Sequence, residues 1–275
     1  MAWSPSKDFD TAADLKYWSN SNDIMDELRG VNFHVSRVHS LLERLERGEL
    51  HSSIANGNVA GYMQNQSSVF IVGTGGHAKV VIELFRAEGR YQIAGLIDND
   101  PAPRSLLGIP VIGTDSDFER LHARGIDKAF VAIGDNETRL KIGRKLDQLG
   151  FDIVNAISPT AVISPTTRLG HGIAIMAGVI INAETRIDDY AVINTRASID
   201  HDGSIGAGAH IGPGVTLAGN VTVGALAFLG VGTHVIPTVS IGESAIIGAA
   251  SCIVRSIPPR ALARGVPARV VSVNE

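Results

Sequence analysis

Residues 187–211 read IDDYAVINTRASIDHDGSIGAGAHI, and every sixth residue of this stretch is isoleucine. The same frame runs without a slip from Ile157 to Ile253, and every position in it holds Ile, Leu or Val. An α-helix repeats about every 3.6 residues and a strand alternates its faces, so neither explains a period of six. The period predicts a hexapeptide β-helix, in which each short strand sends one aliphatic side chain into a shared core and three strands complete one coil. The positions between the two ends are Ile163, Leu169, Ile175, Ile181, Ile187, Ile193, Ile199, Ile205, Ile211, Leu217, Val223, Leu229, Val235, Ile241 and Ile247.

The segment before the repeat, residues 67–156, alternates apolar runs with helical patterns that end at glycines. Such alternation is typical of a parallel sheet covered by helices. The expected fold class is therefore α/β plus all-β, a small Rossmann-like βαβ domain at 67–156 followed by a parallel β-helix at 157–275. We expect strands at 68–72, 91–97, 128–133 and 151–157 and helices at 77–88, 116–124 and 136–149, with Asn136 as N-cap and Gly150 as stop of the last helix.

The first segment, residues 1–66, has a different pattern. Its apolar residues between Ile24 and Leu45 are separated alternately by four and three positions, which predicts a helix with a heptad seam. Such a helix either packs on its own subunit or forms a coiled coil with a second copy or a partner, and both interpretations stay open. Residues 49–67, rich in Ser, Asn, Gly and Gln, read as a linker. The seam consists of Ile24, Leu28, Val31, Val35, Val38, Leu42 and Leu45.

Composition narrows the functional classes. The net charge of −4 and the pI near 6.1 offer no basic surface for nucleic acid or an anionic membrane. The single cysteine, Cys252, excludes an internal disulfide and fits a reducing compartment. No apolar run reaches the length of about 18 residues that a membrane span needs, and no apolar signal core follows Met1. The sequence thus predicts a cytoplasmic protein.

A glycine-rich turn follows the first expected strand. Gly73-x-Gly75-x-x-Ala78, with Asp98 twenty residues further on, fits a dinucleotide fingerprint. The segment of 90 residues, however, supplies only one mononucleotide-binding half, so it favours a single nucleotide, and the alternative is a tight turn without a ligand. The expected contacts are the backbone of Gly75, Gly76 and His77 to phosphate, Asp98 and Asn99 to ribose or base, and Gly134, Asp135 and Asn136 on the same rim with Arg139 reaching phosphate.

Five short motifs in a fixed order carry a family resemblance. With them, residues 67–270 resemble the two-domain bacterial sugar acetyltransferases of the sialic acid O-acetyltransferase and UDP-amino-sugar N-acetyltransferase type. The resemblance implies a left-handed β-helix, a homotrimer, acetyl-CoA bound between neighbouring prisms, and a nucleotide-sugar substrate with Asn194 among its contacts. Residues 1–66 lie outside it. The motifs are Gly73–His77, Ala132–Arg139, Asn194–Asp202, Leu217–Val221 and Gly265–Arg269.

Acetyl transfer from a thioester needs a base for the proton of the nucleophile and donors for the oxyanion. His201, at an outward corner of its hexad, is the candidate base, since a histidine titrates near neutrality. Asp202 beside it is expected to orient the ring or to stabilise its charged form, although members of the family often carry Glu there. A solvent-exposed corner histidine without a catalytic role is the alternative.

Further candidates follow from the resemblance. His210 matches a position near the thioester, and a structural role for it is the alternative. Gly219 would offer its N–H to the oxyanion. Arg264 and Arg269 would meet the phosphates of CoA, unless they are solvated charges of the C-terminal tail. No metal is expected.

The predicted prism is also compatible with other functional classes. Gamma-type zinc carbonic anhydrases share the prism, but the spacing of His171, His201, His210 and His234 lacks the close pair typical of that class. A non-catalytic trimeric scaffold that binds a sugar nucleotide is another possibility. N-acetylation of a nucleotide-linked amino sugar is the leading hypothesis and O-acetylation of a sugar hydroxyl its nearest rival, because both need the same base. The sequence does not identify the sugar or the nucleobase.

Overall fold

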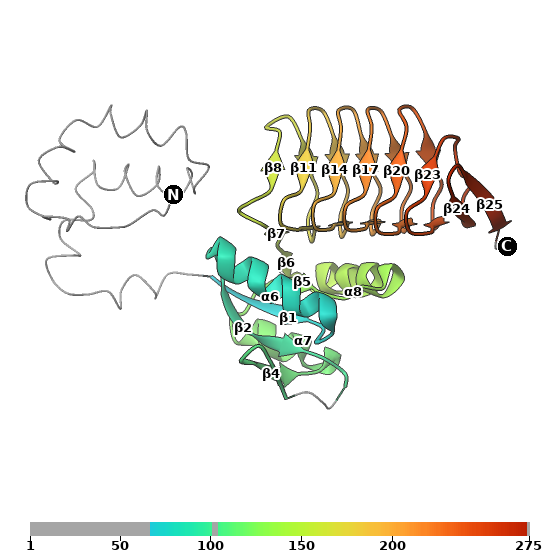
Figure 1. The fold of residues 1–275 in the computed structure, drawn as a ribbon. Helices are drawn as coiled ribbons and strands as arrows, with labels where there is room; N and C mark the ends of the chain where they lie inside the picture. Colours follow the sequence, from blue (N-terminus) through green and yellow to red (C-terminus); the bar gives the residue numbers. More distant parts are fainter. Residues whose placement is uncertain (1–66, 101–103, 274–275) are drawn as a thin grey trace, which may run out of the picture. The chain divides into compact units, whose positions relative to one another are not determined.

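The computed structural model describes residues 67–100 and 104–273, which form a βαβ domain followed by a β-helix (Figure 1). The heptad helix predicted at residues 24–45 lies outside the described residues, as does the linker after it except for its last residue. No helix within the two described ranges is both long and apolar enough to cross a membrane.

The βαβ domain is built around β1 (Ser68–Val72), in which every side chain after Ser68 is buried. The strand order is β3-β4-β2-β1-β5-β6, and every neighbouring pair is parallel except β3 and β4. The other elements are α6 (Gly76–Glu88), β2 (Gln92–Ile97), β3 (Ser105–Leu106), β4 (Ile109–Gly113), a 3-10 turn (Asp115–Asp117), α7 (Phe118–Ala123), β5 (Lys128–Val131), α8 (Asn136–Gln148) and β6 (Asp152–Ile153).

The predicted alternation of strand and helix is confirmed, with three differences in detail. The N-cap of α8 is Asp135 and not Asn136, because the Asp135 carboxylate accepts the N–H of Thr138 at 2.9 Å. The strand predicted at 151–157 is two short strands, one in each domain. The β3–β4 hairpin was not predicted, since its strands are too short for a periodic signal. Gly150 ends α8 as predicted, with φ at 85°.

The βαβ sheet reverses its winding direction at β1. The chain passes from β1 through α6 to β2 on one side, and later returns to β5 on the other side. In open α/β sheets, ligands bind at the carboxyl ends of the strands where the order reverses. The carboxyl ends of β1 and β5 are therefore the expected binding place.

The β-helix confirms the six-residue frame strand by strand. Every frame aliphatic is the second residue of a two-residue strand, and strands 18 residues apart pair in parallel, as Ile175 does with Ile193, so three hexads make one coil. The strands are β7 (Ala156–Ile157), β8 (Val162–Ile163), β9 (Arg168–Leu169), β10 (Ala174–Ile175), β11 (Ile180–Ile181), β12 (Arg186–Ile187), β13 (Val192–Ile193), β14 (Ser198–Ile199), β15 (Ser204–Ile205), β16 (His210–Ile211), β17 (Thr216–Leu217), β18 (Thr222–Val223), β19 (Phe228–Leu229), β20 (His234–Val235), β21 (Ser240–Ile241), β22 (Ile246–Ile247) and β23 (Cys252–Ile253).

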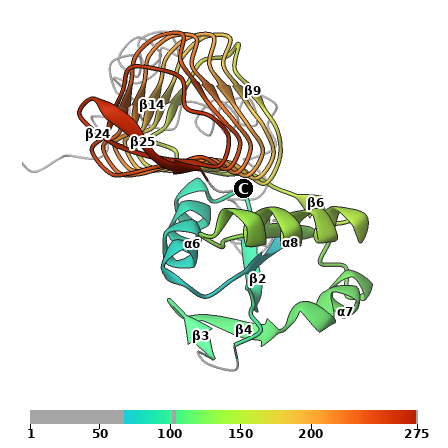
Figure 2. The same ribbon diagram turned by 90° about the vertical axis from the view of Figure 1, so that its right-hand side faces the viewer.

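The coils form a triangular prism, seen end-on in Figure 2, with three flat sheets as its faces. We call the sheet that begins with β7 the first face, the one that begins with β8 the second, and the one that begins with β9 the third. A hairpin of β24 (Ala261–Gly265) and β25 (Ala268–Val273) extends the first face. Several corner glycines are needed for close packing, since a Cβ at Gly224 would lie 2.5 Å from the backbone nitrogen of Glu243 in the next coil.

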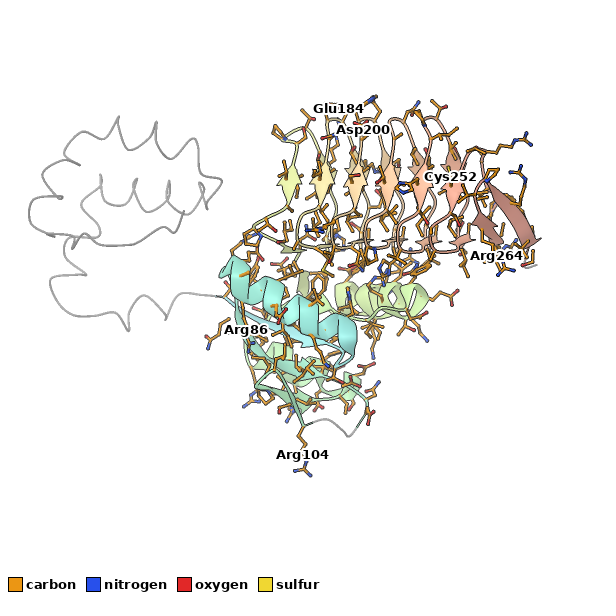
Figure 3. The ribbon with its side chains drawn as sticks, viewed as in Figure 1. Arg86, Arg104, Glu184, Asp200, Cys252 and Arg264 are labelled. Carbon is orange, nitrogen blue, oxygen red and sulfur yellow. The ribbon has the colours of Figure 1, made fainter. Side chains whose placement is uncertain are left out.

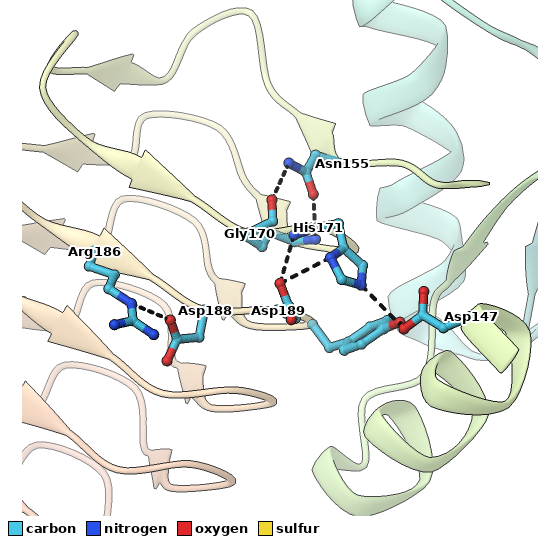
Figure 4. Close-up of polar contacts among 9 residues, drawn as sticks. Asp147, Asn155, Gly170, His171, Arg186, Asp188 and Asp189 are labelled. Atoms are coloured by element: carbon cyan, nitrogen blue, oxygen red, sulfur yellow. Dashed lines mark hydrogen bonds and ion pairs between the residues drawn. The ribbon is translucent and has the colours of Figure 1, made fainter. Parts of the chain in front are cut away.

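Helices α6 and α8 lie between the βαβ sheet and the first face (Figures 1 and 2). One continuous apolar core joins α6 and β1 to the interior of the prism. Polar contacts fix α8 as well: His171 lies 3.2 Å from a carboxylate oxygen of Asp147 and 3.1 Å from one of Asp189, and the Tyr190 hydroxyl donates to Asp147 (Figure 4). The two domains of residues 67–273 are thus packed in a single arrangement.

Candidate active site

A cavity of about 410 Å³ opens where the sheet order reverses. The carboxyl ends of β1, β2 and β5 form its floor, and the first turn of α6 forms one wall. This is the place that the topology of the sheet predicts for a ligand. Six of the residues expected to contact a nucleotide line it together: Gly75, Gly76, His77, Asp98, Asn99 and Gly134.

The cavity offers backbone donors to an anion. Helix α6 begins after Gly75 without a side-chain cap, and a Cβ on Gly75 or Gly76 would meet no atom within 4 Å, so a ligand can approach the backbone closely. The N–H groups at a helix N-terminus favour phosphate. Since the lining residues include no Lys or Arg, these N–H groups are the main electropositive feature of the cavity.

A second hollow of about 370 Å³ adjoins the first through Gly134. Asp135, Asn136 and Glu137 line one side of it, and residues of the prism, among them Phe228, line the other. Phe228 is an outward residue of the first face and is 39% exposed. A ligand held in the larger cavity therefore has room to extend toward the prism.

Arg139 does not reach the cavity, and its predicted role at phosphate is wrong. The side chain is 1% exposed, and every one of its five N–H donors is used within the protein. Nε donates to the Tyr190 carbonyl at 2.9 Å, Nη1 to the carbonyls of residues 133 and 134, and Nη2 to Asn136 Oδ1 and to the Gly208 carbonyl, both at 2.8 Å. Burial lowers its pKa to about 10, so the guanidinium stays charged at neutral pH. Arg139 joins the βαβ domain to the prism.

Asn136 takes part in the same connection. Its Nδ2 donates to the Leu226 carbonyl at 2.9 Å, and its Oδ1 accepts from Arg139. Its amide therefore bonds within the protein, but Asn136 also lines the second hollow, so its predicted role as a substrate contact stays a prediction. Asp135 also has a structural task, the N-cap of α8, and its hydrogen bonds to Thr138 hold the pKa of its carboxyl below the usual value.

A half-buried histidine and a buried one meet between the domains. His77 of α6 and His210 of β16 have ring centroids 6.5 Å apart, and the Asn194 amide lies 3.0 Å from His210 Nε2. Burial, reinforced by the nearby Arg139 charge, lowers the pKa of each histidine to about 4. Both rings are therefore neutral at pH 7. Among the described residues, His77 Nε2 and His210 Nδ1 are buried without a hydrogen-bond partner.

His201 lies on a solvent-exposed corner. It follows β14 and precedes β15, so it projects where the second and third faces meet, and its side chain is 59% exposed. Its Nδ1 lies 2.7 Å from a carboxylate oxygen of Asp202. Asp202 adopts the left-handed conformation, with φ at 56°. Its side chain is shorter than that of the Glu often found at this position in the family, but it still reaches the His201 ring.

The carboxylates around His201 favour its charged form. The hydrogen bond to Asp202 raises the pKa of His201, and the charge of Asp200 adds to the effect. Asp200 is itself fixed, because Asn182 Nδ2 and the His201 N–H donate to the same oxygen at 2.9 Å each. With Nδ1 directed at Asp202, Nε2 is the nitrogen available to a substrate.

Gly219, in the next coil, lies against the His201 ring. A Cβ built on Gly219 would lie 2.6 Å from both Cε1 and Nε2 of the histidine. Within the described part of the chain, the Gly219 N–H donates to no group of the protein. A proton acceptor and an unpaired backbone donor thus lie side by side, as acyl transfer requires.

The corner that carries His201 is opposite the first face. The chain runs through the three faces in turn, so the corner between the second and third faces is the one farthest from the face that α6 and α8 cover. Asp200, next to His201 in sequence, lies along the edge of the prism that points away from these helices (Figure 3). In the described residues no hydrogen bond or ring contact joins His201 to the cavity lining.

Arg264 and Arg269 face each other across the C-terminal hairpin, and both are exposed. In the described ranges, no cluster of three or more His, Cys, Asp or Glu residues is arranged to hold a metal. Sequence reasoning missed Thr74, Asp115 and Thr138 in the cavity lining. Thr74 lies within the glycine-rich turn and was detectable there, whereas Asp115 follows the unpredicted hairpin.

Comparisons with known proteins identify relatives of this chain. The PglD N-terminal domain family matches residues 68–146. PerB from Caulobacter crescentus, solved with CoA and GDP-perosamine, is 53% identical over 74% of this chain and 97% of its own, with a TM-score of 0.72. The acetyltransferase domain of PglB from Neisseria gonorrhoeae, solved with acetyl coenzyme A, is 33% identical over 75% of this chain and 100% of its own, also with a TM-score of 0.72.

A curated relative points the same way. The UDP-N-acetylbacillosamine N-acetyltransferase of Bacillus subtilis is 37% identical over 116 residues, which are 40% of this chain and 51% of the relative. The chain spans about half or less of the length of the curated relatives that it matches. Because PerB and the PglB domain are matched over nearly their whole length, the chain belongs to the sugar acetyltransferase family that includes them.

Proposed function

We propose that this protein transfers the acetyl group of acetyl-CoA to the amino group of a nucleotide-linked amino sugar. The observation that carries the proposal is the corner at which His201, bonded to Asp202, adjoins the unpaired N–H of Gly219. The names of the relatives support the substrate class, since they include perosamine and bacillosamine N-acetyltransferases. Residues 67–156 would bind the nucleotide sugar, and residues 157–275 would carry the transfer.

The arrangement supports a direct transfer. Asp202 accepts a hydrogen bond from Nδ1–H of neutral His201, which leaves Nε2 to take the proton of the attacking amine. The amine nitrogen bonds to the thioester carbon, and the Gly219 N–H donates to the oxygen that becomes negative. When the carbon–sulfur bond breaks, His201 returns the proton to the departing thiolate, so the products are the amide and free CoA.

Acetyl-CoA is the second substrate, and crystals of the relatives contain CoA or acetyl-CoA. The exposed guanidinium groups of Arg264 and Arg269 suit its phosphates, because arginine forms bidentate hydrogen bonds with them. His210, predicted near the thioester, is buried and neutral here, and its role at that position stays a prediction.

Within one subunit, the corner that carries His201 lies on the side of the prism opposite the cavity. This arrangement favours a homotrimer in which His201 of one subunit acts on a substrate bound in the cavity of a neighbour. Outward residues of the second face form a row that contains no Lys, Arg, Asp or Glu and is suited to contact between prisms. At the start of the third face, Arg168 and Arg186 point outward instead. The second-face row is Val162, Ile180, Ser198, Thr216, His234 and Cys252.

The first experiment is thiol release from acetyl-CoA with a panel of amino and hydroxy sugars linked to UDP, GDP, TDP or CMP. We expect turnover on an amino sugar and a loss of about 10²- to 10⁴-fold in His201→Ala. Turnover only on hydroxy sugars would assign O-acetylation instead. Nucleotide binding without any turnover would favour the non-catalytic scaffold, and unchanged turnover in His201→Ala would remove the histidine from the mechanism.

A mixing experiment tests the sharing of sites between subunits. Gly75→Phe fills the cavity without disturbing the backbone, since a Cβ there meets no atom within 4 Å and the φ angle is −76°. Each of His201→Ala and Gly75→Phe alone should be inactive. Co-assembly in equal amounts should restore about a quarter of the wild-type activity if each site combines two subunits. Failure to recover activity in mixed trimers would place both residues in one chain's site.

A further inference from the structure

The cavity continues beyond Asp98 to two side chains that follow neighbouring strands. Asn99 comes after β2 and Asp115 comes after β4, and both line the cavity. Because β2 and β4 pair in parallel, their carboxyl ends meet at the same edge of the sheet. An amide and a carboxylate are thereby brought together at the end of the cavity farthest from β5.

The position of Asp115 relative to Asn99 is fixed by the backbone. The Asp115 N–H donates to Asn99 Oδ1 at 3.1 Å. The turn that carries Asp115 is closed by two further bonds, from Thr114 N–H to Asp117 Oδ2 at 2.8 Å and from Asp117 N–H to the Thr114 carbonyl at 2.9 Å. Neither Thr114 nor Asp117 lines the cavity, so they hold the turn while Asp115 faces the cavity.

Asn99 and Asp115 together leave a hydrogen-bond donor beside a hydrogen-bond acceptor for a ligand. Since Asn99 Oδ1 is bonded to Asp115, its Nδ2 is directed away from that bond. Within residues 67–100 and 104–273, neither Asn99 Nδ2 nor the Asp115 carboxylate has a hydrogen-bond partner. A ligand at this edge thus meets the Asn99 NH2 group, which has two N–H donors, and a carboxylate with two acceptor oxygens.

Of the common bases, guanine matches this pair best. Its edge presents the O6 acceptor next to the N1–H and N2–H donors, so a carboxylate accepts two bonds while an amide donates to O6. Uracil and thymine offer a single N–H between two carbonyl oxygens, one of which would face the carboxylate. Cytosine and adenine present one exocyclic amino donor beside a ring nitrogen acceptor, so they too offer the carboxylate a single donor, whereas guanine offers two.

The order of groups along the sheet edge fits a nucleoside diphosphate. The first turn of α6 lies after β1, Asp98 after β2, and Asp115 after β4. Thr74 Oγ donates to Asp98 Oδ2 at 2.6 Å, and the Asp100 N–H donates to Asp98 Oδ1, so the carboxylate is held in place with lone pairs left for ribose hydroxyls. Phosphate, ribose and base would then occupy successive strands, with the sugar directed over Gly134 toward the prism.

We propose that Asn99 and Asp115 read a guanine base, so that the substrate is a GDP-linked sugar. The proposal rests on the nucleotide site of the proposed function and adds the identity of the base to it. Asp115 is the specificity-determining residue, because its carboxylate distinguishes two donors from one.

Calorimetric titration of the full chain with GDP, IDP, XDP and UDP tests the assignment. IDP lacks the N2 amino group, and XDP carries an oxygen in its place. Wild type should bind GDP at least about tenfold more tightly than IDP, UDP or XDP. In Asp115→Asn the amide now donates to the oxygen of xanthine, so the preference should invert and XDP should bind more tightly than GDP.

A matched control removes a nearby charge without touching the cavity. Glu119→Gln, on the exposed side of α7, should leave the order of the four nucleotides unchanged. Equal binding of GDP and UDP by wild type would overturn the guanine assignment while the nucleotide site stands. If Asp115→Asn weakened the binding of all four nucleotides equally, with no gain in affinity for XDP, the guanine assignment would also be overturned. If the wild type bound none of the four nucleotides, both the proposed nucleotide site and the guanine assignment would be overturned.

Discussion

The ring of His201 lies directly on Gly219, so closely that a Cβ on the glycine would be 2.6 Å from Nε2 of the histidine. The two residues come from successive coils, and the His201 carbonyl accepts the N–H of Asn220 at 2.8 Å. The repeat of the β-helix therefore stacks the candidate base on the candidate oxyanion donor. Only glycine leaves room for this contact, since any side chain at position 219 would enter the volume of the ring.

Gly219→Ala should abolish most of the activity without unfolding the prism. The backbone of Gly219 is not left-handed, and the three atoms nearest to its added Cβ all belong to the exposed His201 ring, which can turn away. Displacement of a reacting group by about 1 Å costs on the order of 10²-fold in rate. We expect a loss of that size in kcat/KM with an unchanged melting temperature.

The double variant Gly219→Ala with His201→Ala provides the control. If the alanine at position 219 lowers the rate only by displacing the His201 ring, the double variant should be no slower than His201→Ala alone. Additive losses would show instead that the added methyl group acts independently of the ring, for example by keeping the thioester oxygen away from the Gly219 N–H.

The pH profile should depend on Asp202. A general base works in its neutral form, so kcat/KM should rise with pH through the pKa of His201, which the Asp202 hydrogen bond raises. Asp202→Asn removes the negative charge while asparagine still tolerates the left-handed backbone. The pKa of His201 then falls, and the acidic limb of the kcat/KM profile should move to lower pH with a lower plateau. If the acidic limb kept its position, Asp202 would have no effect on the pKa of His201.

The two histidines that meet between the domains, His77 and His210, should make the stability of the protein fall in mild acid. The pKa values of His77 and His210 are lowered from 6.5 to about 4 in the folded state, so below pH 6.5 the unfolded chain binds protons that the folded chain does not. Stability is therefore full above pH 6.5 and is lost as the pH falls toward 4, by at most about 3 kcal/mol for each histidine.

Urea denaturation between pH 4 and 7 measures this dependence. His210→Gln should flatten the loss, because a glutamine takes up no proton. His122→Gln, which replaces a half-exposed histidine of α7, serves as the matched control and should retain the wild-type slope. Equal slopes in all three proteins would contradict the assignment of this loss to the two histidines.

Arg139 should be essential for folding rather than for phosphate binding. Arg139→Met removes all five donors and leaves their acceptors buried, among them the carbonyls of Tyr190 and Gly208. Loss of a buried, fully bonded charge costs about 3 to 5 kcal/mol, so we expect a drop of that order in the free energy of unfolding. Arg144→Met, on the exposed side of the same helix, should change stability by no more than about 0.5 kcal/mol. Wild-type stability together with weakened nucleotide binding in Arg139→Met would restore the phosphate role.

The sequence by itself determined the prism. Each hexad repeats the same contacts with the coil above and below, so a strictly local period specifies the strand, the core residue and the corner, as at Ile199 and Gly224. The glycine-rich turn and Asp98 were predictable for a similar reason, because a turn and a strand end are encoded within a few residues. The pairing of His201 with Asp202 followed from their adjacency.

Only the tertiary structure decided what depends on residues far apart in the chain. Arg139 carries a charge that suits phosphate, and nothing near it in sequence announces the carbonyls of Tyr190 and Gly208 that bind it instead. Asp115 enters the cavity because β4 pairs beside β2. His77 and His210 meet because α6 packs on the first face of the prism. Such contacts arise from the packing of one domain on another, which the periodicity of either domain leaves unspecified.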